Sequence, residues 1–183
     1  YTFTDQNGCT GTCEYAITVA PLPLVIAGDD ATICQDGSSY QLSGSVDFTE
    51  SFFWYTLLGT GEFDDPFALN PVYTPGPADY LIGYVEICLQ ATPIAPCTDD
   101  MTDCMTLSFY PEVSVSCPDD FSICINADPF ALTGGLPEGG IYSGTGVENG
   151  IFNPLSAGVG THVINYTFTD QNGCTGTCEY AIT

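Results

Sequence analysis

The chain begins and ends with the same eighteen residues. Tyr1–Thr18 reads YTFTDQNGCTGTCEYAIT, and Tyr166–Thr183 repeats it without a change, at an offset of 165 residues. An identity of this length does not arise by chance, and two old copies would have diverged. Self-similarity at a fixed period is the sequence signature of repeat architectures. The sequence therefore predicts one 165-residue period of a tandem array, in which residues 1–18 are the C-terminal strands of the preceding unit.

The charge of the chain is one-sided. There is no lysine or arginine against 23 acidic residues, so the formal net charge is −23. Phosphate binding needs cationic side chains, which excludes nucleic acid as a partner. An anionic membrane surface is disfavoured for the same reason. Like charge keeps chains soluble but opposes compaction, so we expect divalent cations from the medium as companions.

The composition is that of a folded chain. Hydrophobic residues make up 44% and aromatic residues 13%, whereas disordered acidic chains are poor in aromatic and β-branched residues. No run approaches the length of a transmembrane span, and no signal peptide is visible. We therefore expect no membrane insertion in this segment, and expect any such elements to lie outside it.

Short apolar runs separated by Gly, Pro, Asn and Asp follow one another along the chain. Residues 84–90 alternate between apolar and polar, which is typical of a half-buried strand, and no segment has a long amphipathic helical period. Short strands at regular spacing indicate antiparallel β-sandwiches. Proline-containing linkers open at residues 19 and 111. The sequence thus predicts an all-β chain with one domain at 19–110 and a second, smaller domain at 111–183.

The cysteines form an even set within each period. Ten are present, and two of them, Cys9 and Cys13, are the duplicates of Cys174 and Cys178, which leaves eight per period. An even number in an acidic, loop-rich chain indicates disulfides formed in an oxidising compartment. The alternative is zinc or iron–sulfur ligation, which the lack of any CxxC pair disfavours.

The two domains look like distant relatives, which suggests a pairing. DDATICQDGSSYQLSGS at 29–45 parallels DDFSICINADPFALTGG at 119–135, so Cys34 and Cys124 occupy equivalent positions. Late in each domain, Cys97 and Cys174 lie in equivalent loops. We expect Cys34–Cys97 and Cys124–Cys174 as equivalent bridges, although sequence alone does not prove connectivity.

The remaining cysteines complete the expected set. Cys88 and Cys104 lie on neighbouring strands of the first domain, and Cys117 and Cys178 lie on the first and last strands of the second. We expect each of these two pairs to be bonded. Cys9 and Cys13 are expected to pair with the previous period, outside this segment. Together the expected bridges staple both domains.

Two longer segments carry a family resemblance. Following Trp54, GTGEFDDPFALNPVYTPGPADYLIGYVEICLQAT at 59–92 resembles Ig-like repeats of giant surface proteins from Bacteroidetes bacteria. GGIYSGTGVENGIFNPLSAGVGTHVINYTFTDQNGC at 139–174 is similar to their companion repeat. The resemblance covers nearly all of the chain. It implies two Ig-like antiparallel β-sandwich domains in a secreted adhesin, including the SprB-like proteins of gliding bacteria, usually exported by the type IX system.

Calcium is the metal chemistry that the sequence suggests. Asp29-Asp30 and Asp119-Asp120 each follow a linker, where a metal could stiffen a junction, and Ca²⁺ takes oxygen ligands from carboxylates and carbonyls. The spacing of an EF-hand is absent. The alternative is that these acids are solvated turn residues.

Other chemistry has weaker support in the sequence. Catalysis by serine or cysteine would need a base, and the single histidine, His162, lies in an alternating strand, so we assign no active site and expect no enzyme. Asn165 begins an N-glycosylation sequon, for which the alternative is an unmodified strand asparagine. Trp54 is expected to pack in the core against a disulfide, as in Ig-like sandwiches, rather than to bind sugar.

The sequence predicts a non-enzymatic structural repeat of a long extracellular fibre or cell-surface adhesin. Its expected partners are neighbouring identical repeats, divalent cations and surface glycans. One alternative is a carbohydrate- or ion-binding module of a secreted protein. Another is a self-assembling filament subunit in which the duplicated strands are shared between chains.

Overall fold

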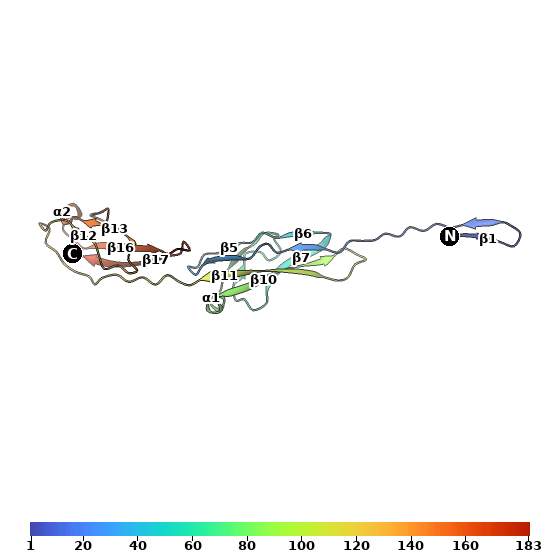
Figure 1. Cartoon of the computed structure of the whole chain (residues 1–183), viewed down its shortest axis with the longest axis horizontal. Coiled ribbons are helices and arrows are strands. Elements are labelled where there is room, and N and C mark those ends of the chain that lie inside the picture. The colour runs from blue at the N-terminus through green and yellow to red at the C-terminus, as the bar shows by residue number, and fades with distance from the viewer.

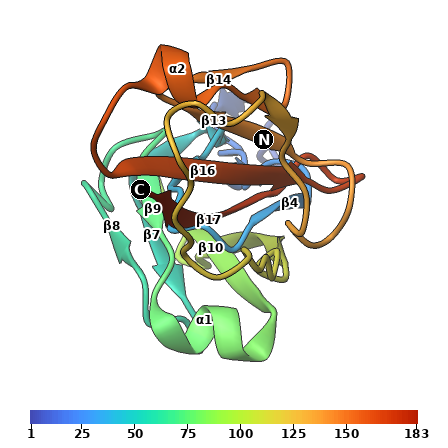
Figure 2. The same cartoon turned by 90° about the vertical axis from the view of Figure 1, so that its left-hand side faces the viewer.

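The computed structural model describes all 183 residues and has the shape of a rod (Figure 1). Two strand-rich bodies follow one another along the long axis, and a separate hairpin lies at the N-terminal end beyond an extended segment. Seen along the axis, the C-terminal body lies in front of the other (Figure 2). Nearly all of the regular structure is β-strand, as expected for an all-β chain.

The N-terminal hairpin consists of β1 (Thr2–Thr4) and β2 (Thr10–Thr12). The first sandwich contains β3 (Leu24–Ile26), β4 (Ala31–Cys34), β5 (Tyr40–Gln41), β6 (Ser45–Asp47), β7 (Thr49–Thr56), β8 (Glu62–Phe63), β9 (Val72–Thr74), α1 (Pro77–Ile82), β10 (Tyr84–Pro93) and β11 (Met101–Tyr110). The second sandwich contains β12 (Phe130–Ala131), β13 (Ile141–Gly144), β14 (Val147–Glu148), β15 (Ile151–Phe152), α2 (Pro154–Ala157), β16 (His162–Thr169) and β17 (Thr175–Ile182).

The first sandwich is built on a four-stranded sheet in the order β4-β11-β10-β7. The long strands β10 and β11 are antiparallel, while β4 runs parallel to β11. A three-stranded sheet, β5-β9-β8, and the pair β3-β6 complete it. Along β10 the apolar side chains that alternate in the sequence become buried, because successive residues of a strand point to opposite faces.

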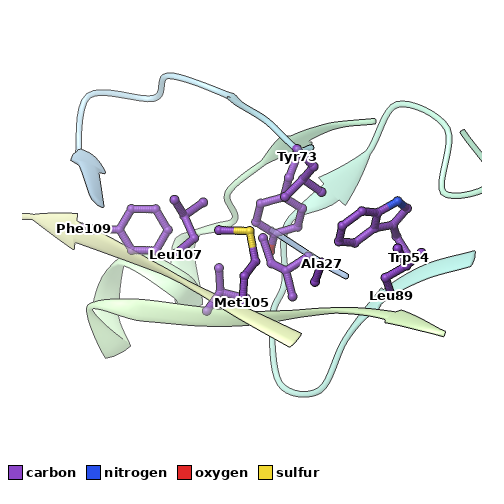
Figure 3. Packing of buried hydrophobic residues seen from close by; sticks show 10 residues of the cluster. Ala27, Trp54, Tyr73, Leu89, Met105, Leu107 and Phe109 are labelled. Carbon is purple, nitrogen blue, oxygen red and sulfur yellow. The ribbon is translucent and has the colours of Figure 1, made fainter. Parts of the chain in front are cut away.

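The core of the first sandwich is a cluster of ten buried residues (Figure 3). Trp54 is 2% exposed, and its indole Nε1 donates to the backbone oxygen of Leu69 at 3.3 Å. Trp54 is therefore a core residue, as predicted. It does not pack on a disulfide, however. Trp54 lies opposite Leu89 in the sheet, whereas Cys88 lies opposite Tyr55, so the Cys88 bridge is on the other face.

The second sandwich is smaller. Its two sheets are β13-β16-β17 and β12-β15-β14, both antiparallel. Five buried residues form its core: Leu132, Phe152, Ile164, Tyr180 and Ile182. The ring of Tyr166 lies against Gly135 and Gly140, where a Cβ atom would come within 2.7 and 2.3 Å of the ring. These glycines are required because the tyrosine fills their side-chain space.

The elements without a counterpart in the sequence pattern are short. Helices α1 and α2 have six and four residues, so neither is long enough to produce a helical period. The expected linker at residue 111 is present: residues 111–115 form no regular structure, and Ser116 makes an isolated bridge to Leu136. None of the helices has the length and apolar character needed to cross a bilayer.

Candidate functional site

The duplicated segment occurs in two structural settings. In the C-terminal copy it supplies the end of β16 and all of β17, and Tyr166 is 1% exposed. In the N-terminal copy the equivalent residue, Tyr1, is 79% exposed, and only the tip of the hairpin forms. The tip has the same register in both copies: Thr2 pairs with Thr12 as Thr167 pairs with Thr177.

The candidate site is the junction between the two sandwiches. Cys34, at the end of β4, is bonded to Cys174, in the turn before β17, with a Cα–Cα distance of 5.5 Å. The linker 111–115 runs beside this bond, and together they line a groove of about 430 Å³. Gly176 lies so close to the linker that a Cβ atom would come within 2.3 Å of the Val113 oxygen. The junction is thus held by a covalent bond and by close backbone packing.

The structure therefore differs from two of the expected bridges. Cys34 is bonded to Cys174, while Cys97 and Cys124 have no partner within the chain. The reason is distance. Cys34 lies opposite Tyr110 at the end of β11, whereas Cys97 precedes the start of that strand. Ten residues of strand span about 30 Å, and the Cα atoms of a disulfide lie within about 7 Å of each other.

The same reason excludes the expected bond from Cys124 to Cys174. Ile123 donates its backbone N–H to the oxygen of Thr183 at 2.9 Å, which places Cys124 at the C-terminal end of β17. Cys174 precedes the other end of that strand. Each sandwich thus has one cysteine at each end, and the equivalence of Cys34 with Cys124 was sound although the pairing drawn from it was wrong.

The other two expected pairs are present. Cys88 bonds to Cys104 directly across β10 and β11, at a sequence separation of 16, and Cys117 bonds to Cys178 at a separation of 61. In the chain-entropy model, loops of these lengths contribute roughly 3 and 4 kcal/mol to stability. Cys9, the N-terminal counterpart of Cys174, is exposed and unbonded, as is Cys13, the counterpart of Cys178.

The two acidic pairs proposed for calcium have the same structural role in each sandwich. Asp30 Oδ1 accepts the backbone N–H of Thr106 at 2.7 Å, and Asp120 Oδ1 accepts that of Ala181 at 2.8 Å. Asp29 and Asp119 are exposed. Neither pair is joined by a third close carboxylate, histidine or cysteine ligand; the one such cluster is Glu86 with Cys88 and Cys104, whose cysteines are bonded to each other.

Backbone N–H groups take the place of the missing cationic side chains. Aspartates throughout the chain accept them, namely Asp5, Asp30, Asp36, Asp64, Asp65, Asp79, Asp103, Asp120 and Asp170. A carboxylate that accepts several N–H bonds is stabilised in its charged form. This explains how an acidic chain folds without ion pairs.

Asp79 is the extreme case, and sequence analysis did not identify it. It is fully buried and accepts from the backbone of Thr60, Gly61 and Gly76 and, at 2.6 Å, from the Tyr73 hydroxyl. Burial opposes its ionisation, but the bonds from Tyr73 and the three backbone groups outweigh burial and lower the pKa of Asp79. Burial, together with the Asp79 carboxylate, raises the pKa of Tyr73. The signal available in the sequence was an aspartate at the third position of a helix that begins with Pro77.

The remaining candidate residues are separate from this junction. Asn165 is exposed on β16, so its side chain is accessible for modification. The ring of His162 is half-buried, and its Nε2 lies 3.0 Å from the backbone oxygen of Gly158. No nucleophile is among its hydrogen-bond partners.

Comparison with known proteins gives structural neighbours only. No family model and no curated sequence matches the chain. Among solved structures it is similar to immunoglobulin domains 1–4 of Sidekick-1, with a TM-score of 0.43 and 10% identity over 99% of this chain and 56% of that one. Sidekick-1 domains 1–5 give a TM-score of 0.42, 12% identity and coverages of 99% and 45%. Human CDH23 EC21-23 gives a TM-score of 0.40 and 10% identity, over 92% of this chain and 66% of that one. The chain spans about half the length of the Sidekick-1 structures.

Proposed function

We propose that the chain is a non-enzymatic structural repeat of a long extracellular fibre or cell-surface adhesin. One observation carries this proposal. The segment that occurs twice in the sequence is, in its C-terminal copy, the part that closes the second sandwich and bonds to the sandwich before it through Cys174. A unit that ends in such a segment, and follows another copy of it, is suited to be joined end to end.

The arrangement of the chain suits it to bear tension. The long strands of both sandwiches run roughly along the rod (Figure 1). At the junction, the Cys34–Cys174 bond runs beside the linker 111–115, so that the covalent bond and the linker share a load applied along the axis. The intradomain bridges Cys88–Cys104 and Cys117–Cys178 limit how far each sandwich can extend when it opens.

The one-sided charge fits a surface fibre. A net charge of −23 keeps neighbouring fibres apart, and the disulfides indicate an oxidising, extracellular setting. Calcium is the proposed cation, bound near Asp29 and Asp119, whose carboxylates face solvent. Titration with Ca²⁺, with Mg²⁺ as control, should raise the melting temperature by mass action; no difference between the two ions would remove calcium from the proposal.

The finer assignment rests on the family resemblance. The GTGEF and NPVYTP motifs of the first sandwich and the FNP and AGVGTH motifs of the second suggest a Bacteroidetes adhesin associated with attachment or gliding. Surface glycans are the proposed ligands of such an adhesin, and Asn165 is the proposed site of its own glycosylation. Mass spectrometry of the peptide that contains Asn165 tests the latter directly.

A second candidate is a self-assembling filament made of separate chains. The exposed hairpin at Tyr1–Thr18, with Cys9 and Cys13 unbonded, favours it. In such a filament this hairpin would complete the second sandwich of another chain. Its place in that sandwich is already filled by Tyr166–Thr183, so assembly would require the chain's own strands to be displaced.

The intact mass of the reduced, denatured protein separates the two candidates. A tandem array predicts one species far heavier than the 19.4 kDa of this chain. Trypsin should leave the array uncut, because it contains no lysine or arginine. A single species near 19.4 kDa would refute the covalent array and favour the filament of separate chains.

A further inference from the structure

Two cysteines per unit have no partner, and they lie at opposite ends of the pair of sandwiches. Cys97 is in the loop between β10 and β11, which lies at the N-terminal end of the first sandwich (Figure 1), and Cys124 lies beside the C-terminal end of β17, at the far end of the second. We propose that Cys124 of one unit and Cys97 of the following unit form a disulfide, so that every joint of the fibre is covalently locked. This proposal rests on the proposed function, because the partner of Cys124 belongs to the next copy of the same unit.

Strand register places Cys124 at the joint. In the first sandwich, β4 runs parallel to the last strand, and Ala31 and Cys34 lie opposite Leu107 and Tyr110. In the second sandwich, Phe121 lies opposite Ile182 in the same parallel sense. Phe121 is the equivalent of Ala31 at an offset of 90 residues, and Cys124 is the equivalent of Cys34. Cys124 therefore falls opposite the third residue after Ile182.

The duplicated segment identifies that third residue. Ile17 is the counterpart of Ile182, and it is followed by Thr18, Val19 and Ala20. In an array, then, Cys124 lies beside Ala20 of the following unit. This correspondence extends through the linkers, since Pro21 and Pro111 also differ by 90 residues.

Cys97, which belongs to the sandwich that follows Ala20, already contacts Ala20 within this chain. Its thiol donates to the backbone oxygens of Ala20 at 3.7 Å and Pro21 at 3.6 Å. The two thiols are thus brought to one residue, Ala20, by two independent features. Strand register positions Cys124 there, and the packing of the β10–β11 loop on the linker positions Cys97.

The junction between the two sandwiches of this chain already contains an equivalent bond. Cys34 is the equivalent of Cys124, and Cys174 lies, like Cys97, in the turn before the last strand. These two are bonded across the junction between the sandwiches, and Pro111, the counterpart of Pro21, lines the same groove. The proposed bond repeats this geometry one sandwich further along. With it, all eight cysteines of a period are paired.

The bond forms by thiol–disulfide exchange. The thiolate of one cysteine attacks an external disulfide, such as an oxidised dithiol protein or oxidised glutathione, and releases one thiol. The second cysteine then attacks this mixed disulfide and releases the other thiol. The two protein thiols are oxidised to one disulfide, and the external disulfide is reduced to two thiols, which carry away both protons.

A two-unit protein tests the joint. Residues 19–183 are appended after Thr183 of the present chain, and the protein is folded with oxidised glutathione and labelled with maleimide after denaturation. The single unit has four free cysteines. The two-unit protein should again label at four, because the joint consumes one Cys124 and one Cys97. Six labelled thiols would overturn the proposal.

The same substitution placed in the first or in the second unit should change the number of labelled thiols in opposite directions. Cys124→Ser in the first unit should raise the count by one, to five, because the following Cys97 loses its partner. The same substitution in the second unit should lower it by one, to three, because that cysteine has no following unit. Equal counts of five in both variants would contradict the joint bond.

A disulfide map of the same samples controls for folding. Chymotrypsin and an acid-specific protease separate Cys97 from Cys88 at Leu89 and from Cys104 at Asp99. The map should contain the three bridges within units together with a Cys124–Cys97 peptide pair. One Cys97 and one Cys124 stay free at the two ends in either case, so three intact bridges without any Cys124–Cys97 peptide pair would refute the proposal. This result is independent of the natural protein's intact mass, so failure of the joint is distinguishable from failure of the array.

Discussion

Tyr1–Thr18 and Tyr166–Thr183 have the same sequence and different structures. Both form the same turn: Asp5 Oδ1 accepts from the backbone N–H groups of Asn7 and Cys9, and Asp170 Oδ1 accepts from the equivalent groups two and four residues on. Beyond the turn they diverge. Ile182 is 1% exposed, whereas its counterpart Ile17 is 75% exposed.

The difference shows which part of this segment is encoded locally. A carboxylate that accepts N–H groups two and four residues on, next to a glycine with positive φ, needs nothing from the rest of the chain. The strands need partners. In the C-terminal copy, Glu179–Ile182 pair with His162–Asn165, which precede the duplicated segment. In the N-terminal copy, the counterparts of Glu179–Ile182, residues 14–17, pair with no strand, and pairing is confined to Thr2–Thr4 and Thr10–Thr12 at the tip of the hairpin.

Deletion of each copy in turn should give the largest difference in stability between the two. Removing Tyr166–Thr183 takes away β17, the end of β16 and two of the five core residues, so the second sandwich should not fold. Removing the identical Tyr1–Thr18 should leave both unfolding transitions unchanged, because that copy contacts neither core. Calorimetry of the two truncated proteins measures this. A second sandwich that melts normally without Tyr166–Thr183 would contradict the account.

Substitution of one tyrosine in each copy gives the next largest effect. Tyr166→Ala empties the space between Gly135 and Gly140 and should cost about 3–5 kcal/mol of unfolding free energy. Tyr1→Ala, at 79% exposure, should change stability by less than about 0.5 kcal/mol. Denaturant unfolding compares them, with Tyr166→Phe as the control that keeps the ring. Similar costs at the two positions would show that both copies pack.

Lowering the pH should destabilise a whole sandwich where the protonated carboxylate is held by tertiary contacts, and only a turn where it is held by its own turn. The pKa of Asp79 is lowered, so its stabilising effect is complete above the ordinary value of 3.8 and is lost as the pH falls through its lower folded pKa. The first sandwich should therefore resist mild acid and unfold only below about pH 4. Asp79→Asn should cost about 2–3 kcal/mol near neutral pH and flatten this dependence.

Asp5 is the matched case, because bonds from Cys9 and Asn7 lower its pKa as well. Its titration should open only the N-terminal turn, with no effect on either sandwich. Carboxyl chemical shifts and thermal melting as a function of pH measure both. An acid transition of the first sandwich that persists unchanged in Asp79→Asn, next to unchanged melting in the exposed control Asp47→Ala, would remove Asp79 from the explanation.

The smallest effect should be equal in the two copies. Gly8 and Gly173 have φ values of +85° and +86° with no atom close to a Cβ position, so alanine at either one costs about 1–2 kcal/mol through the backbone alone. Gly173→Ala should lower the melting temperature of the second sandwich slightly. Gly8→Ala should loosen only the hairpin, seen as lost amide shift dispersion at the turn. A large difference in the turn shifts would show that the turns are not locally encoded.

Sequence analysis predicted most of the fold because the strand pattern is local. The alternation in residues 84–90 became β10, and the bond Cys88–Cys104 joins the neighbouring strands β10 and β11. The expected bond Cys117–Cys178 is present too, although Cys117 lies in no strand. The interdomain bond was missed because equivalence between domains does not say whether a bond lies within or between them. Only the length of β11, which separates Cys97 from Cys34, decides it.

The candidate site was harder to predict for a similar reason. The Asp29-Asp30 and Asp119-Asp120 pairs stood out by composition, and their observed role, in which the second aspartate of each accepts from the last strand, is a tertiary contact. Asp79 is a single acid in a short helix, and its setting depends on Tyr73 and Gly76 close by in the sequence and on the Thr60–Gly61 segment, which is distant in the sequence. Patterns in the sequence do not report such convergence.

Hydrogen exchange on the duplicated peptide tests the central claim most directly. Both copies give a peptide of the same mass, so the isotope envelope should be bimodal, with equal fast and slow populations for the exposed and the packed copy. In a two-unit protein three copies are present, and the middle one follows a complete unit. We expect the middle copy to be protected, giving one fast population for two slow ones. Two fast populations for one slow one would show that the preceding unit does not fold this segment, and would contradict the account.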